Sequence, residues 1–355
     1  MTPFKYNPEQ FDIYIGNDVD QNNFSLTIRE RYRLIMTKKM PAKPQELYNF
    51  IRNQFPGRSV IVGYEAGPTG FGLYDYLIGR DMPCVLLSPS GILKPANERV
   101  KTNRIDSKKI ATMLTDGQFH PVRVPDGPYR ELRHLTILRN NYVKLQRTAK
   151  QRIKSLLLYT GLNETCRDIE QNWSNYYIQH LKTIDCTPAI RLRLDKLLED
   201  LNYARKQLLD VTKQLRKFYT STPEINEHIR NLRTIPGIGF VTATTVLGRI
   251  GNPVNLHNQR ELAAFCGLTP REHSTGDNVR RGGITGLGDA TLRSILIEAS
   301  WMVIQNDTEL GQFYNRIKSK NSTKSGSLKA IVAVAHKLTL RIYRVLVERR
   351  AYIVH

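Results

Sequence analysis

The first 118 residues alternate short apolar runs with helical patterns, and this order restricts the fold more than any other feature of the chain. Residues 11–18 (FDIYIGND), 24–28 (FSLTI) and 31–37 (RYRLIMT) are predicted strands separated by polar or turn-rich breaks. Helical and strand patterns then alternate: a helix at 44–54, a strand at 59–65, a helix near 70–79, a strand at 83–88 and a helix that begins near Asp106. The sequence therefore predicts a mixed α/β domain.

Carboxylates occur where these elements end or begin. Asp18 closes the first apolar run, Glu65 closes the fourth, and Asp106 opens the last helix. The element order is that of the ribonuclease H-like fold, in which the first and fourth strands are neighbours, so both acids are expected at one edge of the sheet. Oxygen ligands of this kind suit Mg²⁺, which takes its remaining ligands from water and substrate phosphates. The arrangement predicts a site that processes phosphodiesters.

The net charge indicates a polyanionic partner. Lys and Arg number 53 against 32 Asp and Glu, a formal charge of +21, of which +17 lies downstream of residue 118. Neutralising phosphates releases counterions and drives association, so a surplus of this size favours a nucleic-acid-binding protein over a merely soluble basic one.

The cysteines and the N-terminus point to the cytoplasm. The four cysteines are scattered without a CxxC pair, which argues against a zinc site or a disulfide framework. The first residues (MTPFKYNPEQFD) lack a basic and apolar signal, and no apolar stretch approaches the ~18 residues needed to span a bilayer. We expect reduced, structural cysteines and a cytoplasmic location.

Long helices follow a predicted linker at 119–130, which contains three prolines. One helical face carries Leu138, Tyr142, Leu145, Ala149, Ile153 and Leu156, and the opposite face carries Arg139, Lys144, Arg147, Lys150 and Lys154. Farther on, Leu194, Leu201, Leu208 and Leu215 recur every seven residues, with Leu197, Ala204, Val211 and Phe218 at the companion position. This heptad seam suits either an intramolecular helical hairpin or an arm that also pairs protomers, and we expect at least a dimer.

The C-terminal third holds two motifs that suit phosphate chemistry. Residues 234–249 predict a helix, a tight turn containing Gly237 and Gly239, and a second helix, a helix-hairpin-helix in which backbone N–H groups face a phosphate. Downstream, Ser274 and Thr275 precede a glycine, and a hydroxyl near several arginines suits a nucleophile that attacks a phosphate. The alternatives are a plain helix connection for the first motif and a turn or helix cap for the second.

Six segments in order resemble one family over nearly the whole chain. They are IYIGNDVD, VGYEAGPTG, VKTNRIDSKKIA, IPGIGFVTATTVL, AAFCGLTPREHSTG and RRGGITGLGDATLRSILIEA. Together they resemble the DEDD-type insertion-sequence transposases related to the Piv DNA invertase, the bridge-RNA-guided recombinases. The resemblance implies a RuvC-like domain, a coiled-coil arm and a mainly helical transposase domain with the helix-hairpin-helix, which we place at 1–118, 119–222 and 223–355.

The resemblance also implies roles for individual residues. Asp18, Glu65 and Asp106 match the first, second and fourth acids of the family, whereas the third position is held by Asn103, whose amide oxygen contributes no charge to a metal site. Ser274 or Thr275 matches the nucleophile, and Ser274, a primary alcohol, is the less hindered. The expected contacts with nucleic acid come from Lys101, Arg104, Gly237, Gly239, Arg271, Arg280, Arg281 and Arg293.

The sequence thus predicts a transposase that excises and inserts its own mobile element with the help of Mg²⁺. The resemblance implies that a bridge RNA pairs with donor and target DNA and that an oligomer builds the composite site. Tyr142, Tyr159, Trp173, Tyr176 and Tyr177 are candidates for stacking on unpaired RNA bases or for core packing. The alternatives are a junction-resolving nuclease, in which the same carboxylates activate water, and a non-catalytic nucleic-acid-binding regulator.

Overall fold

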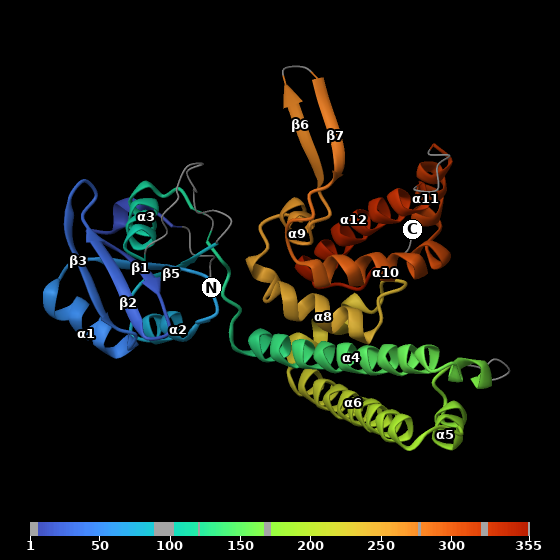
Figure 1. Ribbon diagram of the computed structural model, residues 1–355. Coiled ribbons are helices and arrows are strands. Elements are labelled where there is room, and N and C mark those ends of the chain that lie inside the picture. Colours follow the sequence, from blue (N-terminus) through green and yellow to red (C-terminus); the bar gives the residue numbers. More distant parts are fainter. Residues whose placement is uncertain are drawn as a thin grey trace. The chain divides into compact units, whose positions relative to one another are not determined.

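The computed structural model shows two compact units, residues 1–124 and 125–355 (Figure 1). It describes residues 6–88, 103–119, 121–166, 172–275, 278–320 and 326–353, and for 103–105, 272–275 and 278–281 the backbone alone. Each unit has its own hydrophobic core, so each is described by itself. The predicted division into parts 1–118, 119–222 and 223–355 remains a prediction.

The first unit is built on a mixed sheet of order β3-β2-β1-β4-β5. The strands are β1 (Ile13–Val19), β2 (Asn23–Arg29), β3 (Leu34–Pro41), β4 (Val60–Glu65) and β5 (Cys84–Leu87). The first three strands form antiparallel pairs, and β4 pairs in parallel with both β1 and β5. The expectation that the first and fourth strands are neighbours is confirmed, and the third strand begins three residues later than predicted.

Helices cover both faces of this sheet (Figure 1). Helices α1 (Pro44–Gln54) and α2 (Gly72–Ile78) bury Leu47, Ile51, Leu73 and Leu77 in the core of one face. Helix α3 (Asn103–Asp116) covers the other face with Ile110, Met113 and Leu114. The short 3₁₀ turn η1 (Pro8–Gln10) precedes β1.

Two glycines let α3 lie directly on the strands. A Cβ built at Gly16 in β1 would stand 2.2 Å from the carbonyl oxygen of Ser107 and 2.4 Å from the amide nitrogen of Ala111. At Gly63 in β4 a Cβ would meet both methyl groups of Leu114 at 2.9 Å. Glycine is needed at Gly16 because backbone atoms of α3 fill the space of a side chain.

Buried polar contacts fix the helix in place along the neighbouring strand. The hydroxyls of Thr27 in β2 and Ser107 in α3 lie 2.9 Å apart in the core. Arg29 of β2 donates from Nη1 to the hydroxyl of Thr112 at 2.7 Å. The start of α3 is therefore held beside the carboxyl end of β1.

In its described residues, the second unit consists of helices and one hairpin. Its helices are α4 (Gly127–Tyr159), η3 (Leu162–Cys166), α5 (Asn175–Thr183), α6 (Pro188–Ser221), α7 (Pro223–Leu232), α8 (Phe240–Ile250), η4 (Pro253–Asn255), α9 (Gln259–Phe265), α10 (Ala290–Asn306), α11 (Thr308–Ser319) and α12 (Gly326–Val347). Strands β6 (Pro270–Thr275) and β7 (Asn278–Ile284) form an antiparallel ribbon. Among the described helices, none has both the length and the apolar character needed to cross a bilayer.

The long helices α4 and α6 pack side by side (Figure 1). Leu194, Leu201, Ala204, Val211 and Leu215 of the heptad pattern are buried, so the seam is used within the chain, as the hairpin alternative predicts. On α4, Ala149, Ile153 and Leu156 are buried but Leu138 and Leu145 remain 41% exposed. Pairing of protomers through this arm remains a prediction.

The aromatic candidates for RNA stacking differ in how exposed they are. Tyr177 is fully buried and contacts Trp173 edge to face at 5.5 Å, so it is a core residue. Tyr142 makes an edge contact with Tyr203 across α4 and α6. Tyr159 and Tyr176 are 87% and 73% exposed, which leaves them accessible to a partner.

The segment that carries the two candidate hydroxyl nucleophiles belongs to a β-hairpin. Ser274 pairs with Val279 and Thr275 with Asn278, so both hydroxyl residues end strand β6. The alternative of a turn or helix cap does not apply to these two residues, because antiparallel pairing with β7 makes them part of a strand.

Replacing Gly16 with alanine tests the contact between α3 and the sheet. The added methyl has no room against the α3 backbone, so we expect a loss of about 1–3 kcal/mol in stability, seen as a lower midpoint of thermal unfolding. Gly72→Ala is the matched control, because nothing lies within 4 Å of its Cβ position. Equal midpoints for the two variants would contradict the described contact.

Candidate catalytic site

Asp18 and Glu65 lie side by side at the carboxyl ends of two neighbouring parallel strands. Asn17 of β1 is registered with Tyr64 of β4, so the next residues along each strand are Asp18 and Glu65. Adjacent strands lie ~4.8 Å apart, which brings the two acids to one edge of the sheet. Both residues are half-buried.

Strand alternation places both acids on the face covered by α3. Side chains two residues apart share a face. Tyr14 packs with α3 and Gly16 touches it, so Asp18 projects to the same side. Ile61 and Gly63 give the same assignment for Glu65.

Asp106 belongs to this edge through the first turn of α3. It lies one helical turn before Ile110, which packs against the sheet, and it precedes Ser107, whose backbone touches Gly16. Asn103 is the first residue of α3, three positions earlier, and the structure describes its backbone but not its side chain. The three acids therefore come from β1, β4 and the start of α3, as the element order predicts.

The donor set fits a hard divalent cation by its chemistry, since Asp18, Glu65 and Asp106 offer only carboxylate oxygens. Within the described residues, no three His, Cys, Asp or Glu side chains come close enough together to enclose a metal ion. The acids share one edge of the sheet without forming a closed ligand shell. Mg²⁺ generally keeps waters and takes further ligands from substrate phosphates.

The second candidate group of catalytic residues lies on the β6–β7 hairpin of the second unit. Ser274 and Thr275 end β6, and Arg280 and Arg281 lie on β7 opposite His273 and Glu272. The structure describes only the backbone of these residues, and Lys101 and the side chain of Arg104 lie outside the described part of the chain. The predicted roles of all of them remain predictions.

The foot of the hairpin is anchored by two glycines with positive φ. At Gly267 (φ +65°) a Cβ would stand 1.9 Å from the carbonyl oxygen of Leu287, and at Gly288 (φ +96°) 2.5 Å from that of Phe265. Asp289 donates its backbone N–H to the Phe265 carbonyl at 2.8 Å. The two chain segments that enter and leave the hairpin therefore touch backbone to backbone.

Two of the arginines predicted to bind nucleic acid contact this foot. Arg293 donates from Nη1 to the carbonyl oxygens of Cys266 and Leu287, both at 3.5 Å. Arg271 donates to the carbonyl of Thr285 at 3.2 Å and is exposed. Both residues thus have a structural role, and their contacts with nucleic acid remain predictions.

The two glycines of the predicted helix-hairpin-helix have different surroundings. At Gly237 (φ +80°) a Cβ would lie 2.9 Å from both the carbonyl oxygen of Ala299 and a methyl group of Val303 in α10. This packing accounts for Gly237 without a phosphate. Gly239 is the N-cap of α8 and nothing lies within 4 Å of its Cβ position, so that end of the turn is open.

Sequence reasoning missed the partly buried Arg249, which pairs with Asp289 at the foot of the hairpin. Arg249 of α8 forms an ion pair with Asp289 at 3.3 Å, and the two side chains are only 19% and 13% exposed. Burial, and then the charge of Arg249, lower the pKa of Arg133, while Asp289 raises it. An arginine within the apolar run VTATTVLGRI was the available signal, since a charge there needs a buried partner.

Comparison with known proteins gives the family. Residues 15–161 match the model of the DEDD transposase family, and residues 229–315 match that of the transposase IS116/IS110/IS902 family. The chain belongs to this family of transposases. Transposases are enzymes of DNA transposition, and the match to the first model includes Asp18, Glu65 and Asp106.

Relatives within this family are similar at moderate identity. The chain is 29% identical over 245 residues to the Sinorhizobium fredii protein y4qE, which is named as a transposase. The matched region covers 67% of this chain and 57% of that protein. It is 26% identical over 290 residues to the transposase of the insertion sequence element IS1111A from Coxiella burnetii, covering 79% and 75%. It is also 28% identical over 156 residues to the pilin gene-inverting protein of Moraxella bovis, covering 43% and 48%.

Removing the Asp289 carboxylate tests the anchor of the hairpin. Asp289 caps α10 by accepting from the N–H groups of Thr291 and Leu292, and it also pairs with Arg249. Asp289→Ala should therefore lower stability by about 2–4 kcal/mol, measured by thermal unfolding, because a cap is lost and an arginine is left buried. Asn258→Ala removes the cap of α9 alone and should cost only about 1 kcal/mol. Equal losses would show that the ion pair contributes nothing.

Proposed function

We propose that this transposase is a cytoplasmic DNA recombinase that excises and inserts a mobile element, with a bridge RNA that pairs with donor and target DNA. The metal-binding part is a RuvC-like domain, in which Asp18, Glu65 and Asp106, with Asn103 nearby, hold Mg²⁺. The nucleophile is Ser274, or Thr275 in its place. The observation that supports the proposal is that β1 and β4 end at one edge of the sheet and that α3 begins on the face shared by Asp18 and Glu65, in a chain of this family.

The carboxylates serve the reaction through charge and position. When bound, Mg²⁺ offsets the negative charge that develops on the phosphoryl oxygens. Asp18 and Glu65 are held at fixed strand positions and Asp106 by the contact of α3 with Gly16. Such pre-set geometry favours catalysis because little reorganisation is needed at the moment of reaction.

The hydroxyl step conserves the phosphodiester. The Oγ of Ser274 forms a bond to the scissile phosphorus, and one ester bond of the DNA strand breaks. The departing DNA oxygen takes up a proton and the serine gives one up, so the step is balanced. Attack by another DNA hydroxyl on the phosphoserine linkage reverses the sequence and releases the enzyme without ATP.

The charge distribution supports nucleic acid as the partner. The second unit and its linker carry +17 of the +21 net charge. Exposed Tyr159 and Tyr176 at the far end of the α4–α6 arm suit stacking on unpaired RNA bases. The same arm is the proposed contact between protomers of an oligomer.

A covalent intermediate distinguishes recombination from hydrolysis. With cognate DNA, RNA and Mg²⁺, we expect a protein–DNA adduct that survives denaturing electrophoresis and disappears in Ser274→Ala. If Thr275→Ala abolishes the adduct instead, Thr275 is the nucleophile. Ser319→Ala, which removes an exposed hydroxyl on α11 of this unit, should leave the adduct unchanged. Cleavage that persists in both variants without an adduct would support a junction-resolving nuclease.

Metal affinity tests the carboxylate edge independently of turnover. Asn103→Asp adds a negative charge beside the proposed ligands and should tighten binding of Mn²⁺ or Mg²⁺ about five- to tenfold by calorimetry. Asp18→Asn should weaken binding by at least as much. Asp116→Asn, at the other end of α3, is the control and should have no effect. If Asp18→Asn and Asp116→Asn behaved alike, these acids would not hold the metal.

A further inference from the structure

One face of helix α12 is only partly covered by the rest of the described chain. Its core side is buried by residues such as Ala330, Val334 and Leu338. The other side, which includes Leu328, Lys329, Val332, His336 and Lys337, is half-buried or exposed. Two cavities lie along this face, and Lys337 and Leu340 line both of them.

The first cavity is apolar and lies at the foot of the β6–β7 hairpin. It encloses about 720 Å³ between Pro270, Gly282 and Ile284 of the hairpin and the exposed side of α12, with Phe313 from α11. Leu328, at its edge, is 63% exposed. Lys329 and Lys337 are its charged lining residues, and the lining given by the described chain contains no carboxylate.

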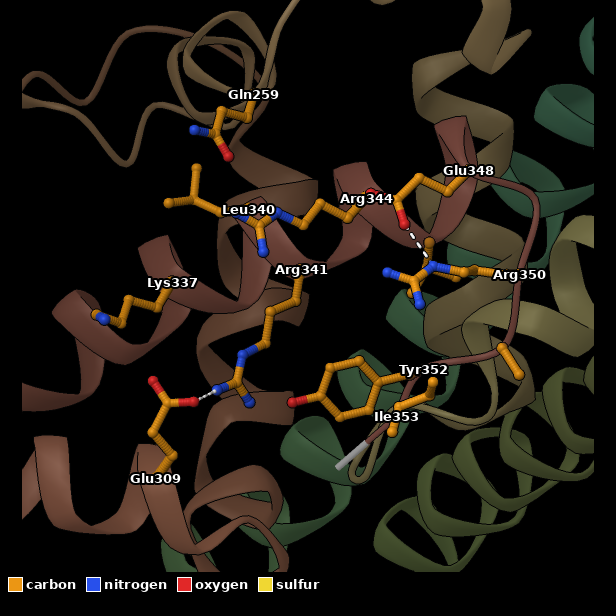
Figure 2. Close-up of a pocket in the computed structure, with 12 residues that line it drawn as sticks. Gln259, Glu309, Lys337, Leu340, Arg341, Arg344, Glu348, Arg350, Tyr352 and Ile353 are labelled. Carbon is orange, nitrogen blue, oxygen red and sulfur yellow. Dashed lines mark hydrogen bonds and ion pairs between the residues drawn. The ribbon is translucent and has the colours of Figure 1, made fainter. Parts of the chain in front are cut away.

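The second cavity continues along α12 and is polar. It encloses about 280 Å³ and is shown in Figure 2. There the side chains of Gln259 and Arg344 extend into the open space, whereas Arg341 turns toward Glu309. Polar and basic groups thus follow directly after the apolar cavity.

The carboxylates of this second cavity are already neutralised. Arg341 contacts Glu309 at 2.6 Å and also pairs with buried Asp307, and Glu348 pairs with Arg350. Arg344 is exposed and has no carboxylate within 4.0 Å among the described residues. Lys337 lies over the Phe313 ring at 4.7 Å, at the junction of the two cavities. The cations left over suit an anionic ligand.

We propose that this continuous groove binds an unpaired nucleic-acid strand, with bases against the apolar cavity and backbone phosphates on Lys337 and Arg344. An unpaired strand presents these two chemistries side by side, flat apolar bases and a phosphate at every nucleotide. Lys337 and Arg344 are seven residues apart, about 10 Å along the helix axis, so they contact different phosphates. This inference rests on the proposed function and extends it. The groove would hold an unpaired nucleic-acid strand at the foot of the hairpin that carries the proposed nucleophile.

Binding of short oligonucleotides to the full chain tests the groove. The probes are fluorescent ten-nucleotide strands of thymidine, of uridine and of abasic residues with the same phosphates, read by anisotropy over a range of salt. We expect the base-bearing strands to bind at least about threefold more tightly than the abasic strand. A preference for thymidine or uridine shows whether the groove favours DNA or RNA.

Matched variants separate base contacts from phosphate contacts. Leu328→Ser should weaken the base-bearing strands about threefold or more and leave the abasic strand unchanged. Arg344→Gln and Lys337→Gln should each weaken all strands and lower the salt slope by about 0.7. The controls are Leu34→Ser, an exposed leucine on β3, and Lys39→Gln on the same strand, and both should match the unchanged protein.

Other outcomes overturn the groove. If base-bearing and abasic strands bind equally, or if Leu328→Ser has no effect, the apolar cavity does not hold bases. If Leu328→Ser changes the oligomer mass but not oligonucleotide affinity, the face is a protein interface. Formation of the protein–DNA adduct separates this test from that of the proposed function. If the unchanged protein forms the adduct but the oligonucleotide tests fail, the groove alone is refuted. If it binds the oligonucleotides as expected but forms no adduct, recombination alone is refuted.

Discussion

The contact between the α3 backbone and Gly16 is the constraint on which the carboxylate edge depends. It places the first turn of α3 against β1, on the face of the sheet that Asp18 and Glu65 share. No side chain larger than hydrogen fits there, because the obstacle is backbone and cannot rotate away. The buried hydroxyl pair of Thr27 and Ser107 then fixes how far along the strand the helix sits.

Much of the first unit was predictable from sequence because its signals are local. Each strand is an apolar run bounded by turns, and parallel neighbours bring their carboxyl ends to one edge, so Asp18 and Glu65 follow from order alone. The hairpin and the partly buried Arg249 were not predictable in this way. They depend on contacts between residues far apart in sequence, such as Arg249 with Asp289, which periodicity does not encode.

Several motifs that stood out in the sequence for their chemistry have packing explanations in the structure. Gly237 is required where a turn meets α10, and Gly267 and Gly288 are required where two backbones touch. The apolar heptad positions of α6 are occupied by contacts within the chain. By contrast, the sequence did not predict a binding site on the exposed side of α12, because its apolar and basic residues alternate without a recognisable motif.

The anchored foot of the β6–β7 hairpin makes the ribbon act as a lever. Strands of six and seven residues extend ~20 Å from foot to tip. A rotation of about 10° at Gly267, Gly288 or Asp289 would therefore move the tip by roughly 3 Å, more than the accuracy that reacting atoms tolerate. The position of the hairpin tip is therefore set by residues at its foot, which take no part in bond making.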